Sequence, residues 1–140
     1  MRLPSYLALH ASGELSIRAE QLERRLACCD ICPWQCKVNR LAGERKVCVA
    51  AHLPIVSSWA PHFGEEPALS GSHLGKGEAR GTGNIFFGHC NLRCVYCQNH
   101  EISQDFRASA AGSEVSHERL ASIMLELQQQ LTNQRTPLTE

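Results

Sequence analysis

Residues 81–103 read GTGNIFFGHCNLRCVYCQNHEIS, and this stretch decides how the rest of the chain is interpreted. The short run at 84–87 (NIFF) lies between Gly83 and Gly88 and predicts a buried parallel strand. Three cysteines follow directly in the pattern C-x3-C-x2-C, namely Cys90, Cys94 and Cys97. A strand that leads into a loop of thiols indicates a site for a metal at the strand's end.

Three thiolates can hold three irons of a cubane [4Fe–4S] cluster, because sulfur is the ligand that iron–sulfur chemistry prefers. A fourth thiolate would close the cluster, whereas three leave one iron open to a substrate. Zinc sites also use C-x2-C pairs, so the spacing alone leaves a zinc ribbon open. The preceding strand, the aromatic Tyr96 and the length of the loop favour the cluster.

Two amphipathic helices are expected on either side of this segment. Residues 117–131 (HERLASIMLELQQQL) form the clearest one, with Ser116 as N-cap. Its expected apolar face comprises Leu120, Ile123, Met124, Leu127 and Leu131. Residues 12–27 form the other, with Ser12 as N-cap. Its expected stripe comprises Leu15, Ala19, Leu22 and Leu26. Strand, ligand loop and helix make the first unit of an α/β fold.

Glycine and proline divide the chain into three parts. We expect an N-terminal helix and four-cysteine module over 1–60, in which the β-prone residues of 49–60 form a short strand or extended arm. Residues 61–83 are rich in Gly and Pro and are expected to be a linker. Residues 84–140 form the second module.

A second set of cysteines lies in the first module, in the pattern C-x2-C-x3-C-x11-C: Cys29, Cys32, Cys36 and Cys48. Four thiolates suit a closed structural zinc site or a second iron–sulfur cluster. A metal-free turn held by packing is the alternative. Cys28 is left out of the set and is expected to be a small buried hydrophobe. The neighbouring basic residues are expected to be a solvated surface: Lys37, Arg40, Arg45 and Lys46.

Composition narrows the class of protein. Fourteen basic and fourteen acidic residues give no net charge, which argues against a nucleic-acid partner. No apolar run reaches the length of a membrane span, so no membrane association is expected. The N-terminal residues lack the apolar core of an export leader. We therefore expect a cytoplasmic protein with reduced thiols, the alternative being a disulfide-stapled secreted domain.

The segment 81–103 resembles the cluster-binding segment of radical S-adenosylmethionine (SAM) enzymes, specifically the pyruvate formate-lyase activating enzyme-like group. That group carries the motif C-x3-C-x-aromatic-C, which Cys90, Cys94, Tyr96 and Cys97 match position by position. Residues 29–48 (CDICPWQCKVNRLAGERKVC) and 63–71 (FGEEPALSG) resemble a cysteine-rich leader found in a subgroup of these proteins. The resemblance covers roughly residues 5–130.

The resemblance implies a chemistry. The open iron of the [4Fe–4S] cluster would chelate SAM, and one electron would cleave it to methionine and a 5′-deoxyadenosyl radical, which abstracts hydrogen from a substrate. In activating enzymes the substrate is a glycyl-radical enzyme, and the electron donor is a flavodoxin or ferredoxin. Tyr96 and Asn99 would help to place the adenine, while Tyr96 as a wall that shields the cluster is the alternative. No residue is assigned a catalytic role.

The resemblance also implies a fold, the partial (β/α) barrel of radical SAM proteins. Residues 84–140 suffice for one full strand–loop–helix unit, so the chain reads as the truncated front part of such a barrel. Because later strands would grip SAM, we expect this chain to bind a cluster but to cleave SAM slowly. The alternative function is a non-catalytic iron–sulfur or zinc binding module.

Overall fold

The computed structural model describes residues 4–50, 52–64, 69, 78–79, 81–104, 113–133 and 136–137. The chain divides into two compact units. The N-terminal unit comprises Met1–His52 together with Cys90–Leu92, and the C-terminal unit comprises Leu53–His89 together with Arg93–Glu140. No helix among the described residues is both long and apolar enough to cross a membrane.

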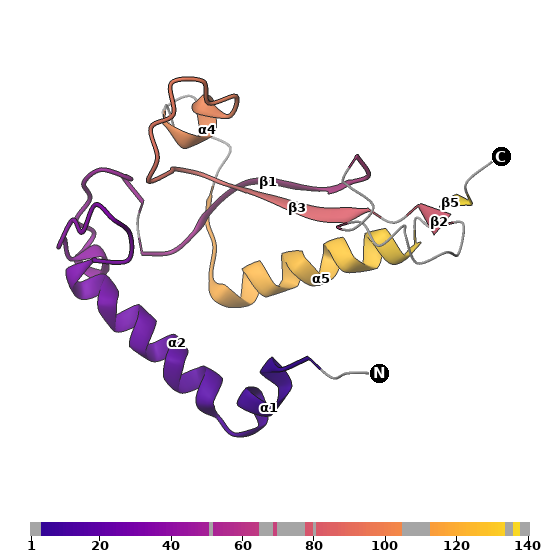
Figure 1. Ribbon diagram of the computed structural model, residues 1–140, viewed down its shortest axis with the longest axis horizontal. Coiled ribbons are helices and arrows are strands. Elements are labelled where there is room, and N and C mark those ends of the chain that lie inside the picture. Colours follow the sequence, from indigo (N-terminus) through magenta and orange to yellow (C-terminus); the bar gives the residue numbers. More distant parts are fainter. Residues whose placement is uncertain are drawn as a thin grey trace. The chain divides into compact units, whose positions relative to one another are not determined.

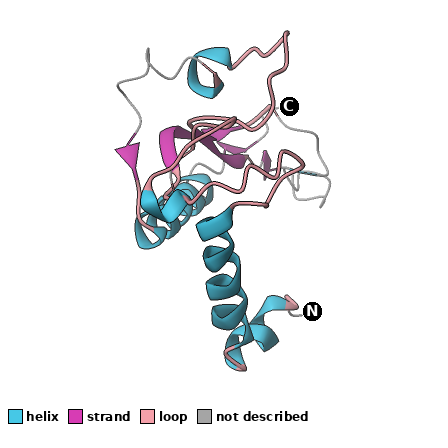
Figure 2. Cartoon of the chain, turned by 90° about the vertical axis from the view of Figure 1, so that its left-hand side faces the viewer, coloured by secondary structure: helices cyan, strands magenta, loops and turns pink. Residues whose placement is uncertain are grey.

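Two helices and a 3-10 turn open the N-terminal unit: α1 (Tyr6–Ala11), α2 (Glu14–Arg24) and the turn Arg25–Cys28. The helices meet at a sharp bend (Figure 2), where Gly13 takes a left-handed backbone with φ of 76°. The predicted N-cap at Ser12 is wrong. Ser12 instead ends α1, and its hydroxyl donates to the Leu9 carbonyl at 3.0 Å.

The predicted apolar stripe of the helix over 12–27 is not buried. Neither α1 nor α2 contains a buried residue, and Leu22 is 56% exposed. The elements that pack most closely on α2 are α1 and the turn Arg25–Cys28, and both are too short to cover a stripe along its length. The periodicity predicted the helix and not its burial.

The C-terminal unit is built on a three-stranded antiparallel sheet in the order β3-β1-β4. Strand β1 (Ile55–His62) pairs along its length with β3 (Thr82–Phe87), with Trp59 opposite Ile85, and its first residues pair with β4 (Ser113–Glu114). The strand predicted at 84–87 is therefore present, but the expectation that it is parallel is wrong. Its partner precedes it in the chain and runs in the opposite direction.

Helix α5 (His117–Asn133) lies along β1 and β3 (Figure 1) and supplies half of the core residues. Among the described residues the core cluster consists of the buried Val56, Val115, Ile123 and Leu127, and Ile85 and Leu120 pack against it. Two glycines lie where neighbouring atoms come close, Gly83 facing α5 and Gly81 facing the end of β1. A Cβ on Gly83 would lie 3.1 Å from the Cβ of Leu127, and one on Gly81 would lie 2.7 Å from the His62 carbonyl oxygen.

The predicted helix over 117–131 and its N-cap are confirmed, since the Arg119 amide donates to the Ser116 hydroxyl at 3.2 Å. One member of its predicted apolar face is wrong, because Met124 is 58% exposed. The sheet covers only one side of α5, and Met124 lies beside the buried Ile123 but outside that contact. Beyond the packed Ile85, the last two residues of β3 are also exposed, Phe86 to 37% and Phe87 to 45%.

The remaining described elements are short. Helix α4 (His100–Ser103) follows the cysteine loop, and β2 (Glu78–Ala79) pairs antiparallel with β5 (Thr136–Pro137). The described strands thus form two small antiparallel sheets and no barrel. The fold is mixed α/β, as the sequence predicts in coarse outline.

Candidate metal-binding cysteine clusters

The loop between β3 and α4 carries Cys90, Cys94 and Cys97. It is closed at its base by the His89 amide, which donates to the Ile102 carbonyl at 2.8 Å. A tight turn inside the loop brings the Cys97 amide within 3.3 Å of the Cys94 carbonyl. All three thiols are free and partly exposed. The fold thus presents the predicted ligands on one irregular loop directly after a strand.

Polar contacts already reach two of these sulfurs. The Leu92 amide donates to the Cys90 sulfur at 3.3 Å, and the Cys97 sulfur lies 3.3 Å from the Ser103 hydroxyl. Hydrogen bonds to sulfur are one means by which proteins tune iron–sulfur centres. Within the described ranges, no three His, Cys, Asp or Glu side chains are gathered so that they can hold a metal ion.

The two residues predicted to place an adenine lie on the same loop. Tyr96 is 87% exposed, and the neighbouring Val95 is 99% exposed. Asn99 precedes α4, where its carbonyl accepts from the Ile102 and Ser103 amides and its side chain makes no capping hydrogen bond. Neither predicted role of Tyr96, adenine placement or cluster shielding, is tested by contacts in the structure.

The first cysteine set lies in a knuckle of the N-terminal unit. The backbones of residues 29 and 37–38 pair, with the Cys29 amide donating to Val38 at 2.9 Å and the Lys37 amide donating to Cys29 at 2.8 Å. Cys29 and Cys36 are buried, while Cys32 and Cys48 are partly buried. All four are free thiols.

Cys28 behaves differently from its neighbour. It was expected to be buried, and that expectation is wrong, because the structure exposes Cys28 and buries Cys29. The 3-10 turn ends at Cys28, and the pairing with the knuckle begins at the next residue. Cys28 is therefore outside the knuckle, in line with its exclusion from the ligand set.

Arg40 is the unexpected member of this site. It was expected to lie on a solvated surface, but it is only 4% exposed. Its Nε donates to the Cys29 sulfur at 3.0 Å, its Nη2 to the Cys48 sulfur at 2.9 Å, and its Nη1 to the Ala50 carbonyl at 2.6 Å. The expectation fails because sulfur acceptors, which the sequence does not mark as partners of arginine, hold the guanidinium inside.

A short capped turn positions Arg40. The turn Arg40–Ala42 is preceded by Asn39, whose side-chain oxygen accepts from the Ala42 amide at 3.1 Å. It ends at Gly43, which has a left-handed backbone with φ of 79°. Asn at the start and Gly at the end are the residues that such a turn favours.

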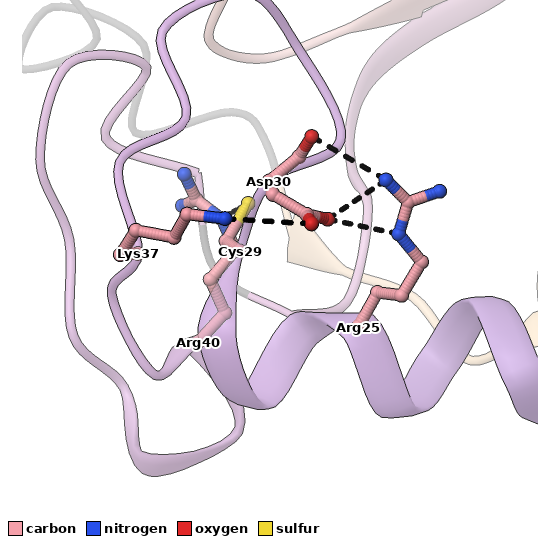
Figure 3. A network of polar contacts seen from close by, with 5 residues as sticks. All are labelled: Arg25, Cys29, Asp30, Lys37 and Arg40. Atoms are coloured by element: carbon pink, nitrogen blue, oxygen red, sulfur yellow. Dashed lines mark hydrogen bonds and ion pairs between the residues drawn. The ribbon is translucent and has the colours of Figure 1, made fainter.

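Electrostatics favour the ionised form of one thiol. Burial raises the pKa of Cys29, but the hydrogen bonds from Arg40 and from the Ile31 amide outweigh burial, so that its pKa lies below the usual value. A polar network around the neighbouring Asp30 carboxylate lies next to Cys29 (Figure 3). Asp30 accepts hydrogen bonds from Arg25 at 2.8 Å and from Lys37 at 3.5 Å. The hydrogen bond from Arg25 is the main cause of the lowered pKa of Asp30.

Strained backbone marks both cysteine clusters. Among the described residues, four non-glycine residues have positive φ: Gln35, Lys37, Val49 and His89. Each is adjacent to a cysteine, since Gln35 and Lys37 flank Cys36, Val49 follows Cys48 and His89 precedes Cys90. Such conformations cost about 1–3 kcal/mol each and collect at functional sites. The sequence gives little signal for this feature, because Gln, Lys and Val rarely adopt positive φ, and only His89 is of a type enriched there.

Comparison with known proteins gives one informative similarity. The chain is 36% identical over 90 residues to the uncharacterized protein MJ0674 of Methanocaldococcus jannaschii. The match includes 64% of this chain and 23% of that protein, so the chain spans about a quarter of the relative's length. No protein-family model and no solved structure matches the chain.

Proposed function

We propose that the chain binds a [4Fe–4S] cluster through Cys90, Cys94 and Cys97 and belongs to a radical SAM protein of the glycyl-radical-activating type. The observation that carries the proposal is the loop itself. Three free, partly exposed thiols lie between a strand and a short helix, on a loop closed at its base by the hydrogen bond from His89 to Ile102. The motif within the loop is the one that the radical SAM resemblance requires.

The three loop thiols are of the chemical type that binds a [4Fe–4S] cluster. Free cysteine thiols are the ligands of iron–sulfur clusters, and none of the three is in a disulfide. The sulfurs are not gathered in a metal-holding geometry, so binding has to draw them together on the loop. Residues 88–99 contain no helix or strand that would oppose this movement. When bound, the cluster and SAM supply reductive cleavage of the carbon–sulfur bond and a hydrogen-abstracting radical.

Other residues of the loop have roles that follow from their placement. The exposed ring of Tyr96 offers a face for stacking on an adenine, and the Asn99 amide is not used as a helix cap. The Ser103 hydroxyl, 3.3 Å from the Cys97 sulfur, would stabilise that sulfur as a ligand. These residues would orient SAM and shield the cluster, while the cofactor would carry the redox chemistry.

The finer fold and the partners belong to the same proposal. The order strand, cysteine loop, helix is that of the first unit of a radical SAM barrel, although the described strands are antiparallel. The proposed function therefore rests on the cysteine loop more than on the fold. The partners that we propose are a glycyl-radical enzyme as substrate and a flavodoxin or ferredoxin as electron donor. The compartment that belongs to this proposal is the cytoplasm, where thiols are kept reduced.

Anaerobic reconstitution with iron and sulfide tests the proposal. The wild-type chain should give the electron paramagnetic resonance (EPR) signal of a reduced [4Fe–4S] cluster, and Cys90→Ala, Cys94→Ala and Cys97→Ala should each lose it. Cys28→Ala is the matched control, because this exposed thiol lies outside both clusters and its loss should leave the signal unchanged. Equal iron and an equal signal in all three loop variants would overturn the assignment.

A further inference from the structure

The buried guanidinium of Arg40 identifies the chemistry of the first cysteine set. Arg40 is always charged and is 96% shielded from solvent, so the structure must supply compensating acceptors. The acceptors described for its guanidinium are the Cys29 and Cys48 sulfurs and the Ala50 carbonyl, with no carboxylate among them. A buried guanidinium that donates to two cysteine sulfurs favours the thiolate form of those cysteines over the neutral thiol.

The Cys29 and Cys48 sulfurs accept from the same edge of the Arg40 guanidinium. Nε and Nη2 form the edge of the guanidinium that offers two parallel N–H donors, the edge that grips both oxygens of one carboxylate. Here the same edge donates to two sulfurs from residues 19 positions apart in the chain. One side chain therefore joins the knuckle around Cys29 to the distant Cys48.

The knuckle brings the other two cysteines into the same module. The pairing of Cys29 with Lys37 and Val38 fixes the segment that contains Cys32 and Cys36 as a closed turn. Positive φ on both sides of Cys36, and at Val49 after Cys48, holds these positions in conformations that the chain alone disfavours. Strain at three positions beside two of the four thiols indicates that their placement serves a site.

These contacts favour a single ion over a cluster. Sulfurs about 2.3 Å from one zinc ion must lie close to each other, and a shared guanidinium edge holds the Cys29 and Cys48 sulfurs near one another. Four thiolates around one divalent ion also leave a net negative charge, which the buried guanidinium offsets. Since no third ligand is gathered in the described structure, Cys32 and Cys36 have to close on this pair.

We propose that Cys29, Cys32, Cys36 and Cys48 bind one divalent metal ion of the zinc class, and that Arg40 is a positioning residue that donates to two of the four sulfurs. The proposal stands on a different set of cysteines from the proposed function. Partners of metal ligands such as Arg40 typically change metal affinity by 10- to 100-fold when they are replaced.

Zinc binding in a variant that lacks the loop thiols tests the ligand set. In Cys90→Ala/Cys94→Ala/Cys97→Ala, the full chain should bind one equivalent of zinc, measured by elemental analysis and by competition with a chromophoric chelator. Adding Cys29→Ala, Cys32→Ala, Cys36→Ala or Cys48→Ala should abolish binding, whereas adding Cys28→Ala should not. Retention of iron and sulfide in place of zinc, or equal zinc after Cys29→Ala and Cys28→Ala, would overturn the proposal.

The native chain gives a test that does not depend on the folding of variants. Zinc should protect Cys29, Cys32, Cys36 and Cys48 from alkylation, measured by mass spectrometry, while the adjacent Cys28 reacts as an internal control. Equal reactivity of Cys28 and Cys29 in zinc-loaded protein would overturn the ligand set.

Arg40 has its own test. Arg40→Gln should weaken zinc binding by 10- to 100-fold, and Arg40→Lys should not restore it, because lysine is a point charge without two parallel donors. Arg45→Gln is the control, an exposed basic residue of the same segment, and should bind zinc as the wild type does. Unchanged affinity in Arg40→Gln, or full affinity in Arg40→Lys, would overturn the positioning role.

Discussion

Ile123 is the residue on which the packing of the C-terminal unit most depends. It is the largest fully buried side chain among the described residues and lies with Val56, Val115 and Leu127. Its neighbour Met124 is 58% exposed. Adjacent positions on α5 thus have opposite environments, which allows a paired comparison within one helix.

Ile123→Ala should lower the free energy of unfolding by about 2–5 kcal/mol, because it removes buried methyl groups and leaves a cavity. Met124→Ala should change it by less than about 0.5 kcal/mol, since its side chain is mostly in solvent. Urea unfolding of the full chain followed by circular dichroism measures both. Equal destabilisation by the two substitutions would contradict the core described here.

Single residues also show where sequence reasoning on the site reached its limit. The four-cysteine spacing predicts a site, but it predicts neither that Arg40 is buried nor that Cys28 is exposed. Burial of these residues depends on contacts with distant positions, such as the Cys48 sulfur for Arg40. The spacing of the cysteines along the chain does not predict those contacts.

At the level of elements, α5 has a well-defined start. The Ser116 hydroxyl accepts from the Arg119 amide, and its hydrogen bond with the Glu118 carboxylate, joined by the backbone amide of Glu118, lowers the pKa of Glu118. The folded-state pKa of Glu118 is thus below its unfolded value. The Glu118 carboxylate therefore stabilises the folded state at pH values above its pKa in the unfolded chain. This stabilisation is lost as the pH falls through its pKa in the folded chain.

Ser116→Ala should lower the free energy of unfolding by about 1 kcal/mol, because an amide of the first turn loses its acceptor. The pKa of Glu118 should rise toward its usual value, and the stability difference from wild type should shrink as the carboxylate is protonated in acid. Urea unfolding across acidic pH and NMR titration of Glu118 measure the two effects. An unchanged pKa of Glu118 in the variant would contradict this cap.

The elements that could be predicted are those that depend on local pattern. The helix over 117–131, its N-cap and strands near 49–60 and 84–87 all follow from periodicity or composition, and all are present. The direction of β3 could not be predicted in this way, because it depends on its pairing with β1. The break between α1 and α2 was missed, although Gly13 was a visible signal for it.

At the scale of the whole molecule, the two cysteine clusters share two properties. Both contain free thiols, and both are bordered by non-glycine residues with positive φ. Within the N-terminal unit, the Trp34 indole donates to the Asn91 carbonyl at 2.7 Å, so that the knuckle contacts the residue after Cys90. Each cluster therefore combines free thiols with a backbone conformation that non-glycine residues rarely adopt.

One measurement tests most directly our proposal that the loop cysteines hold a cluster with one iron open to SAM. The reconstituted chain is reduced with dithionite, and its EPR spectrum is recorded with and without SAM. Cys36→Ala serves as a control that leaves the loop ligands intact. We predict that SAM changes the spectrum of the wild type and of Cys36→Ala. A cluster signal that SAM leaves unchanged would contradict the account and would indicate a closed, non-catalytic iron–sulfur centre.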